Sequence, residues 1–438
     1  MDRDTEESSP WESLAMGLGF NEPDEEYWWT VFAQPLNQLM QWANYSIAEQ
    51  YRVLAFLHRY VIPTCGPKPD QNGEQFWKAY MTFDQTPIEI SINFHDNKAT
   101  VRATNIPVSR SSGSELDPLN QNPSTNALEA QKHLIPGPSL RLFEHFKNAF
   151  FIPNDDAIVL NAQMLNRTFA AQALQCLLSY DFPYQKVQTK VDICPLWKSV
   201  QLNKPVPGLL FQSIKDLGAE VDSYMNSLNV LTDFVDSGDA EKLGTGPMFF
   251  AFDTNLSDGY QSSRIKIYFA TTHTALNRMV DIFTLGGRLN GPEMDRAIQA
   301  LRLLWSLVIN APADQSDDAD ISPANPHCCA SVLFNFEIWP GAHLPIPQIY
   351  LPAAYYGKPD LDIAEGMDKF FKSQGWNQPF HSYKENYVKA FMKGQKITCR
   401  HHDVSFSYKG GGAYVTAYYK PELEAFASAT TWSPKFYK

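Results

Sequence analysis

The segment SRIKIYFATT (263–272) alternates charged or phenolic side chains with large apolar ones. Successive side chains of a β-strand point to opposite faces, so the apolar residues share one face and the other face carries Arg264, Lys266 and Tyr268. Guanidinium and ammonium groups presented together bind an anion if their face lines an enclosed site. For any one strand taken alone, the alternative is a solvated outer face of a sheet.

Several other alternating segments carry polar side chains at the same parity. This inward set comprises Glu89, Ser91, Asn93, Arg102, Lys190, Asp192, Gln348, Tyr350, Tyr414, Thr416 and Tyr418. If the faces meet, their cations need an anion, because an unpaired buried charge costs several kcal/mol. The donors suit a diphosphate, and a tyrosine ring stabilises a cation by roughly 0.5 to 2 kcal/mol per contact. This combination fits the ionisation of an allylic diphosphate.

Helical stretches alternate with hairpins along the chain. EEYWWTVFAQPLNQLMQWANY is followed by SIAEQYRVLAFLHRYVIP, which opens on a capping box of Ser46 and Glu49 and stops at Pro63. Roughly five hairpins would give about ten antiparallel strands, and such a sheet commonly closes to remove its edges. We therefore predict an α+β fold: a closed antiparallel β-barrel surrounded by a ring of α-helices and built from ααββ-like repeats. One domain spans 1–438, with 1–24 and 421–438 as peripheral tails.

The composition restricts the partners and the compartment. The 438 residues carry a formal net charge of -12, which repels nucleic acid and anionic membranes, so any cationic cluster must be local. The acidic start lacks a secretory signal, and no apolar run reaches the ~18 residues of a membrane span. We expect a cytoplasmic protein whose six cysteines are reduced and unpaired.

The chain resembles the fungal dimethylallyltryptophan synthase (DMATS) type aromatic prenyltransferases in the order and spacing of six segments: EEYWWTVFAQPLNQLMQWANY, TPIEISINF, TKVDICP, SRIKIYF, PIPQIYLP and VTAYY. The resemblance implies the ABBA or PT-barrel fold, which agrees with the repeat. It also implies that Glu89 accepts the indole N–H. It further implies a diphosphate site that contains Arg102, Lys190, Arg264, Lys266, Tyr268, Gln348, Tyr350 and Tyr418, the tyrosines also shielding the allyl cation.

The reaction implied by this resemblance needs no metal and no cofactor. Dimethylallyl diphosphate, the co-substrate, ionises, the aromatic ring attacks the cation, and a base removes the ring proton. The partners are then a small aromatic acceptor and the diphosphate, with no nucleic acid or membrane, for a monomer or homodimer. Met248, Tyr414 and Asp192 are candidates for the acceptor pocket.

Two departures from the family pattern bear on the acceptor and the base. Asp192 stands where the family often has Tyr, and a carboxylate beside a diphosphate is repulsive unless it pairs with a cation such as Lys190. Counting from Asp253, Met248 stands where members acting on free tryptophan have an Arg. This favours a tryptophan-containing cyclic dipeptide or a larger indole alkaloid. The ring-proton acceptor stays open between Gln175, Ser179 and Asp181, depending on register.

Alternative interpretations remain at several points. Glu89 could pair with Arg102, the acceptor could be a phenol, or the barrel could bind a diphosphate without chemistry. A magnesium-dependent terpene cyclase would need an aspartate motif such as DQSDDAD (314–320), but the Pro, Ala and Ser residues around it indicate a surface loop. HCC (327–329) and CRHH (399–402) fit no common zinc spacing, so we expect them to be unrelated.

Overall fold

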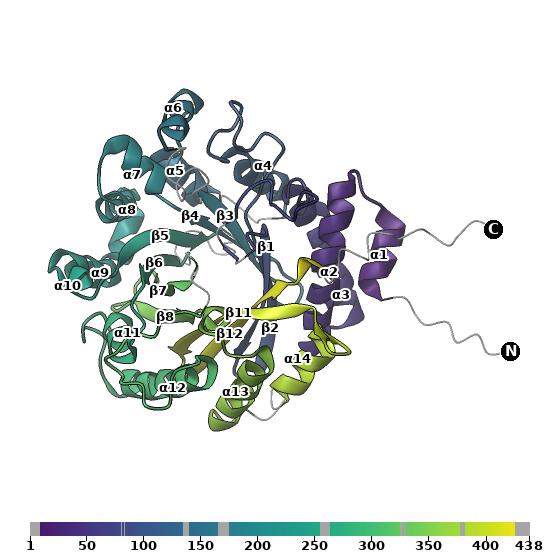
Figure 1. The fold of residues 1–438 in the computed structure, drawn as a ribbon. Coiled ribbons are helices and arrows are strands. Elements are labelled where there is room, and N and C mark those ends of the chain that lie inside the picture. Colours follow the sequence, from purple (N-terminus) through teal and green to yellow (C-terminus); the bar gives the residue numbers. More distant parts are fainter. Residues whose placement is uncertain are drawn as a thin grey trace, which may run out of the picture.

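Ten antiparallel strands close into one barrel in the computed structural model (Figure 1). It describes residues 9–79, 81–82, 84–134, 140–164, 175–254, 263–324, 327, 330–376 and 382–424, without the side chains of 163, 164, 219 and 220. The barrel strands are β1 (Ile88–His95), β2 (Lys98–Asn105), β3 (Cys176–Asp181), β4 (Gln188–Ile193), β5 (Gly246–Asp253), β6 (Ile265–Thr271), β7 (Val332–Ile338), β8 (Ile346–Leu351), β11 (Cys399–Lys409) and β12 (Gly412–Pro421). The short pair β9 (Met392–Lys393) and β10 (Lys396–Ile397) lies outside it.

Strands that follow one another in the chain are neighbours in the barrel. The order is β1-β12-β11-β8-β7-β6-β5-β4-β3-β2, and β1 closes the ring because it pairs with both β2 and β12. The five predicted hairpins and the closed antiparallel barrel are confirmed. Closure leaves no free strand edge and separates an inner from an outer face.

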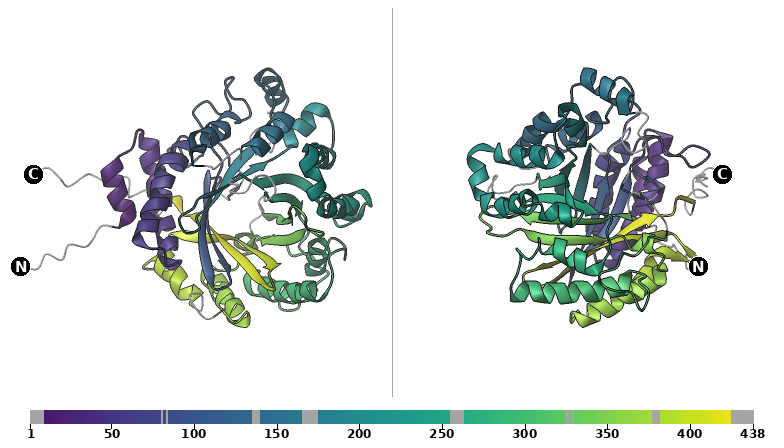
Figure 2. Two further views of the ribbon diagram at one scale, coloured as in Figure 1. Left: turned by 180° about the vertical axis from the view of Figure 1, so that it is seen from behind. Right: turned by 60° about the vertical axis from the view of Figure 1, so that its left-hand side comes forward.

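Helices surround the barrel in chain order, as Figure 1 and the views from behind and from the side in Figure 2 show. They are α1 (Pro10–Leu18), α2 (Pro23–Trp42), α3 (Ile47–Phe56), α4 (Asn122–Gln131), α5 (Arg141–Phe150), α6 (Asn154–Met164), α7 (Leu196–Leu202), α8 (Val206–Lys215), α9 (Met225–Asp236), α10 (Asp239–Lys242), α11 (Leu276–Phe283), α12 (Pro292–Val308), α13 (Asp360–Ser373) and α14 (Tyr383–Phe391). Each of the first four hairpins is therefore followed by helices that return the chain over the outside of the barrel.

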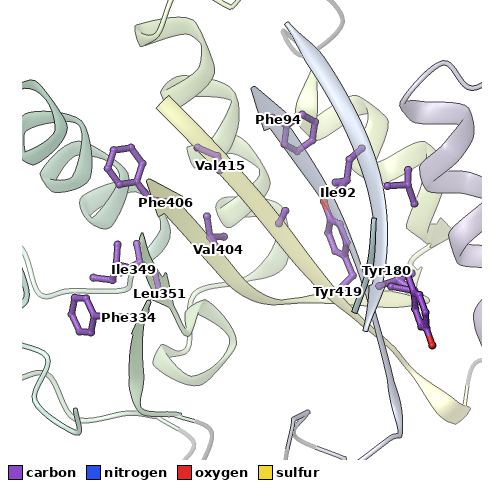
Figure 3. Packing of buried hydrophobic residues seen from close by; sticks show 14 of the residues in the cluster. Ile92, Phe94, Tyr180, Phe334, Ile349, Leu351, Val404, Phe406, Val415 and Tyr419 are labelled. Carbon is purple, nitrogen blue, oxygen red and sulfur yellow. The ribbon is translucent and has the colours of Figure 1, made fainter. Parts of the chain in front are cut away.

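The apolar parity of the strands makes the core between barrel and helices. Ile265, Ile267 and Phe269 of β6 have no exposed surface. Figure 3 shows side chains of the same parity on other strands, among them Ile92 and Phe406, in the same buried layer. Full burial of one such side chain stabilises the fold by about 1.5–3 kcal/mol. The apolar face of each strand therefore packs against the helices, and the opposite, polar face points into the lumen.

The start of α3 shows a predicted cap that is only half formed. Ser46 Oγ accepts a hydrogen bond from the Glu49 amide at 3.3 Å, as predicted. The Glu49 carboxylate turns instead to Arg52, at 2.6 Å, and to the Gln185 amide, at 3.1 Å. A charged partner on the next turn outcompetes the backbone amide of the cap. The helical run continues through the π turn Leu57–Val61 and the 3-10 turn Ile62–Thr64, ending beside Pro63 as expected.

The aspartate-rich segment 314–320 is an irregular surface loop, as expected. Asp320 caps α11 by accepting hydrogen bonds from the amides of Thr274 and Ala275, and Asp317 pairs with Arg302 at 2.7 Å. The carboxylates thus hold a loop against helices rather than facing one another on a helix.

The described cysteines, Cys65, Cys176, Cys194 and Cys399, are all free, as expected. Cys328 and Cys329 lie outside the described residues, as do 1–8 and 425–438 of the predicted tails 1–24 and 421–438. The described part of the first tail contains α1 and the start of α2, and β12 ends at Pro421. Among the described helices, none combines the length and the apolar character that crossing a bilayer requires.

Candidate active site

Strand register brings the predicted polar residues onto the inner face of the barrel. Residues directly opposite on neighbouring strands project to the same side. Such pairs link Ser91 to Arg102 and Tyr418, and others run around the barrel through Lys190–Asp253, Lys266–Glu337, Tyr268–Asn335, Gln348–Ser407 and Ser407–Tyr414. The four predicted cations therefore face one lumen instead of being spread over the outside.

Two carboxylates organise these cations. Asp181 lies 2.6 Å from Lys190 Nζ and 3.1 Å from Arg102 Nε. Glu337, which is 1% exposed at its side chain, lies within 3.2 Å of Arg264, Lys266 and Lys409. The ion pairs form two groups on the lumen wall, which together are called the cationic network.

Asp253 completes the network with a contact to Arg264 at 3.0 Å. Sequence reasoning did not assign Asp253, Glu337 or Lys409 to the site, although their strands, MFFAFD, VLFNFEI and VSFSYK, carry the same alternation. Five cations then face three carboxylates that pair with them, which leaves an excess of positive charge for an anion.

The pKa values in this network follow from burial and from the neighbouring charges. Burial would raise the pKa of Asp181 and Glu337, but the cations hold both well below the usual range. Burial and the nearby Arg264 lower the pKa of Lys266 to about 7, against the attraction of Glu337. Lys266 is thus a cation whose charge depends on pH near neutrality.

Asp192 stays apart from the ion pairs. Burial raises its pKa to about 7, although Lys266 and Lys190 oppose this. The Ser179 hydroxyl donates to it at 3.4 Å, and no cation lies within ion-pair distance among the described residues. Lys190, the partner that the sequence suggested, pairs with Asp181 instead.

An aromatic row crosses the inner face next to the cations. Phe249 stacks on Tyr268 at 4.2 Å, and the ring centroids of Tyr268 and Tyr350 are 6.1 Å apart. Tyr350 and Tyr418 follow at 5.7 Å. Burial raises the pKa of all three phenols well above the usual value, so they remain neutral donors with electron-rich rings.

Gln348 lies beside the aromatic row, and Tyr414 lies between Arg102 and Lys409. Gln348 donates to Ser405 at 2.8 Å and accepts from Asn335, which also donates to the Tyr350 hydroxyl at 3.0 Å. Tyr414, predicted for the acceptor pocket, accepts a hydrogen bond from Arg102, and Lys409 Nζ lies 4.2 Å from the centre of its ring. Tyr414 therefore contacts the cationic network directly.

Glu89 has different neighbours from those that the sequence offered. Arg102 pairs with Asp181 and Tyr414, whereas Glu89 Oε1 lies 3.1 Å from His402 Nδ1. Burial raises the pKa of Glu89, and His402 partly offsets this. Nothing in the sequence separation of the two residues indicates this contact.

Met248 does not follow the regular parity of β5. A register shift between Pro247 and Phe249 breaks the alternation, and Met248 is 42% exposed. Phe249, one residue on, takes the position opposite Tyr268. Counting back from Asp253 to Met248 ends at this irregularity. The count therefore does not establish that Met248 occupies the position of the family's Arg.

The register of β3 narrows the candidates for the ring-proton acceptor. Ser179 and Asp181 face the lumen opposite Lys190 and Gln188, whereas the Gln175 side chain donates to the carbonyl of Cys194 at 3.5 Å. Asp181 is held ionised by two cations and is a weak base. Asp192, on the neighbouring strand, is a lumen carboxyl whose pKa burial raises to about 7.

Comparisons with known proteins agree with this geometry. Residues 24–386 match the family described as tryptophan dimethylallyltransferase. The chain is 68% identical to an indole diterpene prenyltransferase of Penicillium janthinellum, over 99% of both chains, and 61% identical to one of Penicillium paxilli, over the whole of both.

Solved structures show the same barrel. AnaPT from Neosartorya fischeri superposes with a TM-score of 0.80 at 26% identity, covering 94% of this chain and 98% of its own. NotF in complex with brevianamide F and DMSPP gives 0.79 at 25% identity, covering 95% and 99%. The chain therefore belongs to the tryptophan dimethylallyltransferase family and is a prenyltransferase whose strands form the ten-stranded barrel of that family.

Proposed function

We propose that this chain transfers a dimethylallyl group from dimethylallyl diphosphate to the indole ring of an indole diterpene, without a metal ion. The observation that carries the proposal is the lumen itself: a cationic network, a row of aromatic rings and a buried carboxylate face one another on its wall. These are the groups that an anionic leaving group, an allyl cation and an indole N–H respectively require.

The diphosphate binds to the cationic network. Arg102, Lys190, Arg264 and Lys266 supply charge, with Tyr268, Gln348, Tyr350 and Tyr418 as neutral donors, and Lys409 joins them through Glu337. Cations held by Asp181 and Glu337 need little reorganisation when the C–O bond of the substrate breaks. The pyrophosphate product keeps the electron pair of that bond, and the network stabilises its added negative charge.

The allyl cation then lies against the rings of Tyr268, Tyr350 and Tyr418. Each ring face stabilises positive charge by roughly 0.5–2 kcal/mol and occupies space that water would need. Because burial keeps these phenols neutral, they do not trap the cation as phenolates. The row thus delays capture by water until the indole attacks.

Glu89 accepts the indole N–H and increases the electron density of the ring. Attack forms one C–C bond and leaves a ring cation that must lose a proton from the substituted carbon. We assign this proton to Asp192, because its carboxyl has no cation at ion-pair distance within the described part of the chain and a pKa of about 7. Pyrophosphate is the competing acceptor.

The acceptor follows from the relatives. Proteins named indole diterpene prenyltransferases share 61–68% of residues with this chain over nearly its full length. The cyclic dipeptide alternative is supported by NotF, in complex with brevianamide F, at 25% identity. A phenolic acceptor lacks the N–H that the Glu89 carboxylate would recognise.

The test is a product assay with and without EDTA. The enzyme is incubated with dimethylallyl diphosphate and, separately, an indole diterpene, a tryptophan-containing cyclic dipeptide, free tryptophan and a phenol, and both product mass and pyrophosphate are measured. We expect the fastest dimethylallylation with the indole diterpene, unchanged by EDTA. A faster cyclic dipeptide would reassign the acceptor, loss with EDTA would contradict metal independence, and tight binding without pyrophosphate release would support a non-catalytic barrel.

We also propose that residues 1–438 act as one domain in the cytoplasm, as a monomer or homodimer with no nucleic-acid or membrane partner. The net charge of -12 supports the absence of nucleic-acid and anionic-membrane partners, because the cations described above face inward. Cell fractionation and light scattering of the purified protein test these points.

A further inference from the structure

The sequence CRHH places two histidines next to each other in very different surroundings. Both are buried, His401 to 1% and His402 to 3% exposure. A register shift in β11 between His401 and Val404 separates their environments. His401 contacts Asp360 on the helical side, at 3.1 Å, whereas His402 contacts Glu89.

His402 is held by three polar groups from three elements. Its Nδ1 lies 3.1 Å from Glu89 Oε1 on β1 and 2.7 Å from Asp403 Oδ2 on its own strand. Its Nε2 lies 2.8 Å from the hydroxyl of Tyr355, in the 3-10 turn Ala353–Tyr356. Neither carboxylate lies in line with Nδ1 as a good hydrogen bond requires, so the attraction is mainly between charges.

The protonation state follows from this arrangement. A neutral imidazole with its lone pair on Nδ1 would be repelled by both carboxylates, and one protonated at Nδ1 alone would leave both without a cation at ion-pair distance among the described residues. With a proton on each nitrogen, it faces two anions and gives Nε2–H to the Tyr355 oxygen. Burial alone would lower the pKa of His402, but Asp403 and Glu89 raise it to about 10. His402 is therefore an imidazolium throughout the neutral range.

The charge of His402 acts directly on the pKa of Glu89. Burial raises the pKa of Glu89, His402 lowers it, and Asp403 raises it. Within the described part of the chain, the other titratable groups that face the pair are Tyr355, Tyr418 on β12, whose pKa the Glu89 charge raises, and His327, whose pKa is lowered by burial and by the charge of His402. His402 is thus the cation that keeps this buried carboxylate charged.

We propose that His402 is a positioning residue that holds Glu89 as an ionised carboxylate on the lumen wall, through Oε1, so that Oε2 can accept the indole N–H. This inference rests on the function proposed above for Glu89. It assigns a role to a segment that the sequence left without one, and it does not require His402 to touch either substrate.

The test is the pH profile of kcat/KM for prenylation of the indole diterpene by the full-length protein. The acid limb of this profile contains the two carboxylates that must be ionised, Glu89 and Asp192. In His402→Gln the Glu89 part of the limb moves to higher pH, by about 1 to 3 units for loss of one adjacent opposite charge, whereas the Asp192 part stays near pH 7. In Asp403→Asn the same part of the limb as in His402→Gln moves to lower pH, because a repelling carboxylate is lost. Opposite shifts from neighbouring residues cannot come from a general loss of packing.

His401→Gln is the matched control, since that residue is equally buried and contacts no described lumen residue of the proposed site. Its acid limb stays at the wild-type pH even if the fold loses stability. Nitrogen NMR of labelled histidine gives a second readout, with His402 doubly protonated up to about pH 9.

The outcomes separate the inference from the function on which it rests. Glu89→Gln with wild-type turnover overturns the role of Glu89. A nearly inactive Glu89→Gln together with an unshifted His402→Gln profile overturns only the positioning role. Glu89, His402 and Asp403 could also hold a metal ion, so a loss of wild-type activity in EDTA that zinc or magnesium restores would replace the imidazolium with a metal.

Discussion

Two regions of the same lumen treat buried carboxylates in opposite ways. Around Glu337 and Asp181, each carboxylate is shared by two or three cations, and its pKa falls well below the usual range. Around Glu89, two carboxylates share one imidazolium, and the pKa of Glu89 rises. One strand pattern has thus produced a region that stays charged and a region that can exchange protons.

The difference shows that residue type alone does not set the chemistry of a lumen position. Cations in excess make carboxylates into permanent counter-ions, and the surplus charge can bind a diphosphate. Carboxylates in excess leave acceptors for N–H groups and protons. A prenyltransferase needs both regions a short distance apart, because the electrophile and the nucleophile meet between them.

The largest effect should come from the carboxylate-rich region. Glu89→Gln keeps the shape and loses the charge, so turnover should fall by about 10²- to 10⁴-fold while the affinity for the diphosphate is retained. Single-turnover rates and calorimetry with a non-ionising thio analogue measure the two separately. Equal losses in both would show that the two regions are not independent.

Substitution of Asp192 tests whether its carboxyl accepts the ring proton or belongs to the diphosphate site. Asp192→Asn should lower turnover by about 10²-fold or more if the carboxyl takes the ring proton, with the KM for dimethylallyl diphosphate unchanged or lower. A turnover like that of the wild type would assign the proton to pyrophosphate, and a large rise in KM alone would make Asp192 part of the diphosphate site.

The substitution Glu337→Gln tests the cation-rich region. Three cations lose their shared anion, and removal of one partner of a buried network costs about 3–5 kcal/mol of unfolding free energy. Adding pyrophosphate should raise the melting temperature of this variant by more than it raises that of the wild type. Glu365→Gln is the control, because its pairs with Lys369 and Lys384 are exposed and screened by solvent, so its loss should change stability far less. Equal stability of the two variants would contradict the network.

Lys266→Ala should weaken the binding of the thio analogue by about tenfold or more, the scale of a charge-assisted hydrogen bond of at least ~1.5 kcal/mol. Lys242→Ala removes an exposed lysine that pairs with Asp239 outside the barrel and should leave affinity unchanged. Matching affinities for the two variants would place Lys266 outside the diphosphate site.

The smallest expected effect is a pH dependence of diphosphate binding. The pKa of Lys266 is about 7, and an anion binds the protonated form, so affinity is full below pH 7 and declines as pH rises through that value. For one proton, the dissociation constant of the anion rises by up to about tenfold per pH unit. The rise ends at the higher pKa that Lys266 has when the anion is bound. Lys266→Arg, which stays charged, should remove the slope. A slope that persists in this variant would point to Asp192, whose pKa is also about 7.

The sequence predicted the barrel because alternation, helix periodicity and turns all pointed to the same architecture. Parity also predicted the inner face correctly for Arg102, Lys190, Arg264 and Lys266, since a shift by one residue would expose the apolar set. Two predictions that did not rest on parity fared differently: the count from Asp253 to Met248 ends at a register shift in β5, and Arg52 takes the Glu49 carboxylate from the predicted capping box.

Sequence by itself therefore determined which residues face the lumen, because burial of the apolar parity is worth more than any single polar contact. Only the tertiary structure decided which lumen residues pair. Asp181 takes Lys190, Glu337 joins three cations, and His402 reaches Glu89 from the far end of the chain. The contact between His402 and Glu89 depends on closure of the ring between β1 and β12 and on the bulge in β11, and alternation along one strand carries no information about the partners that its side chains find on other strands.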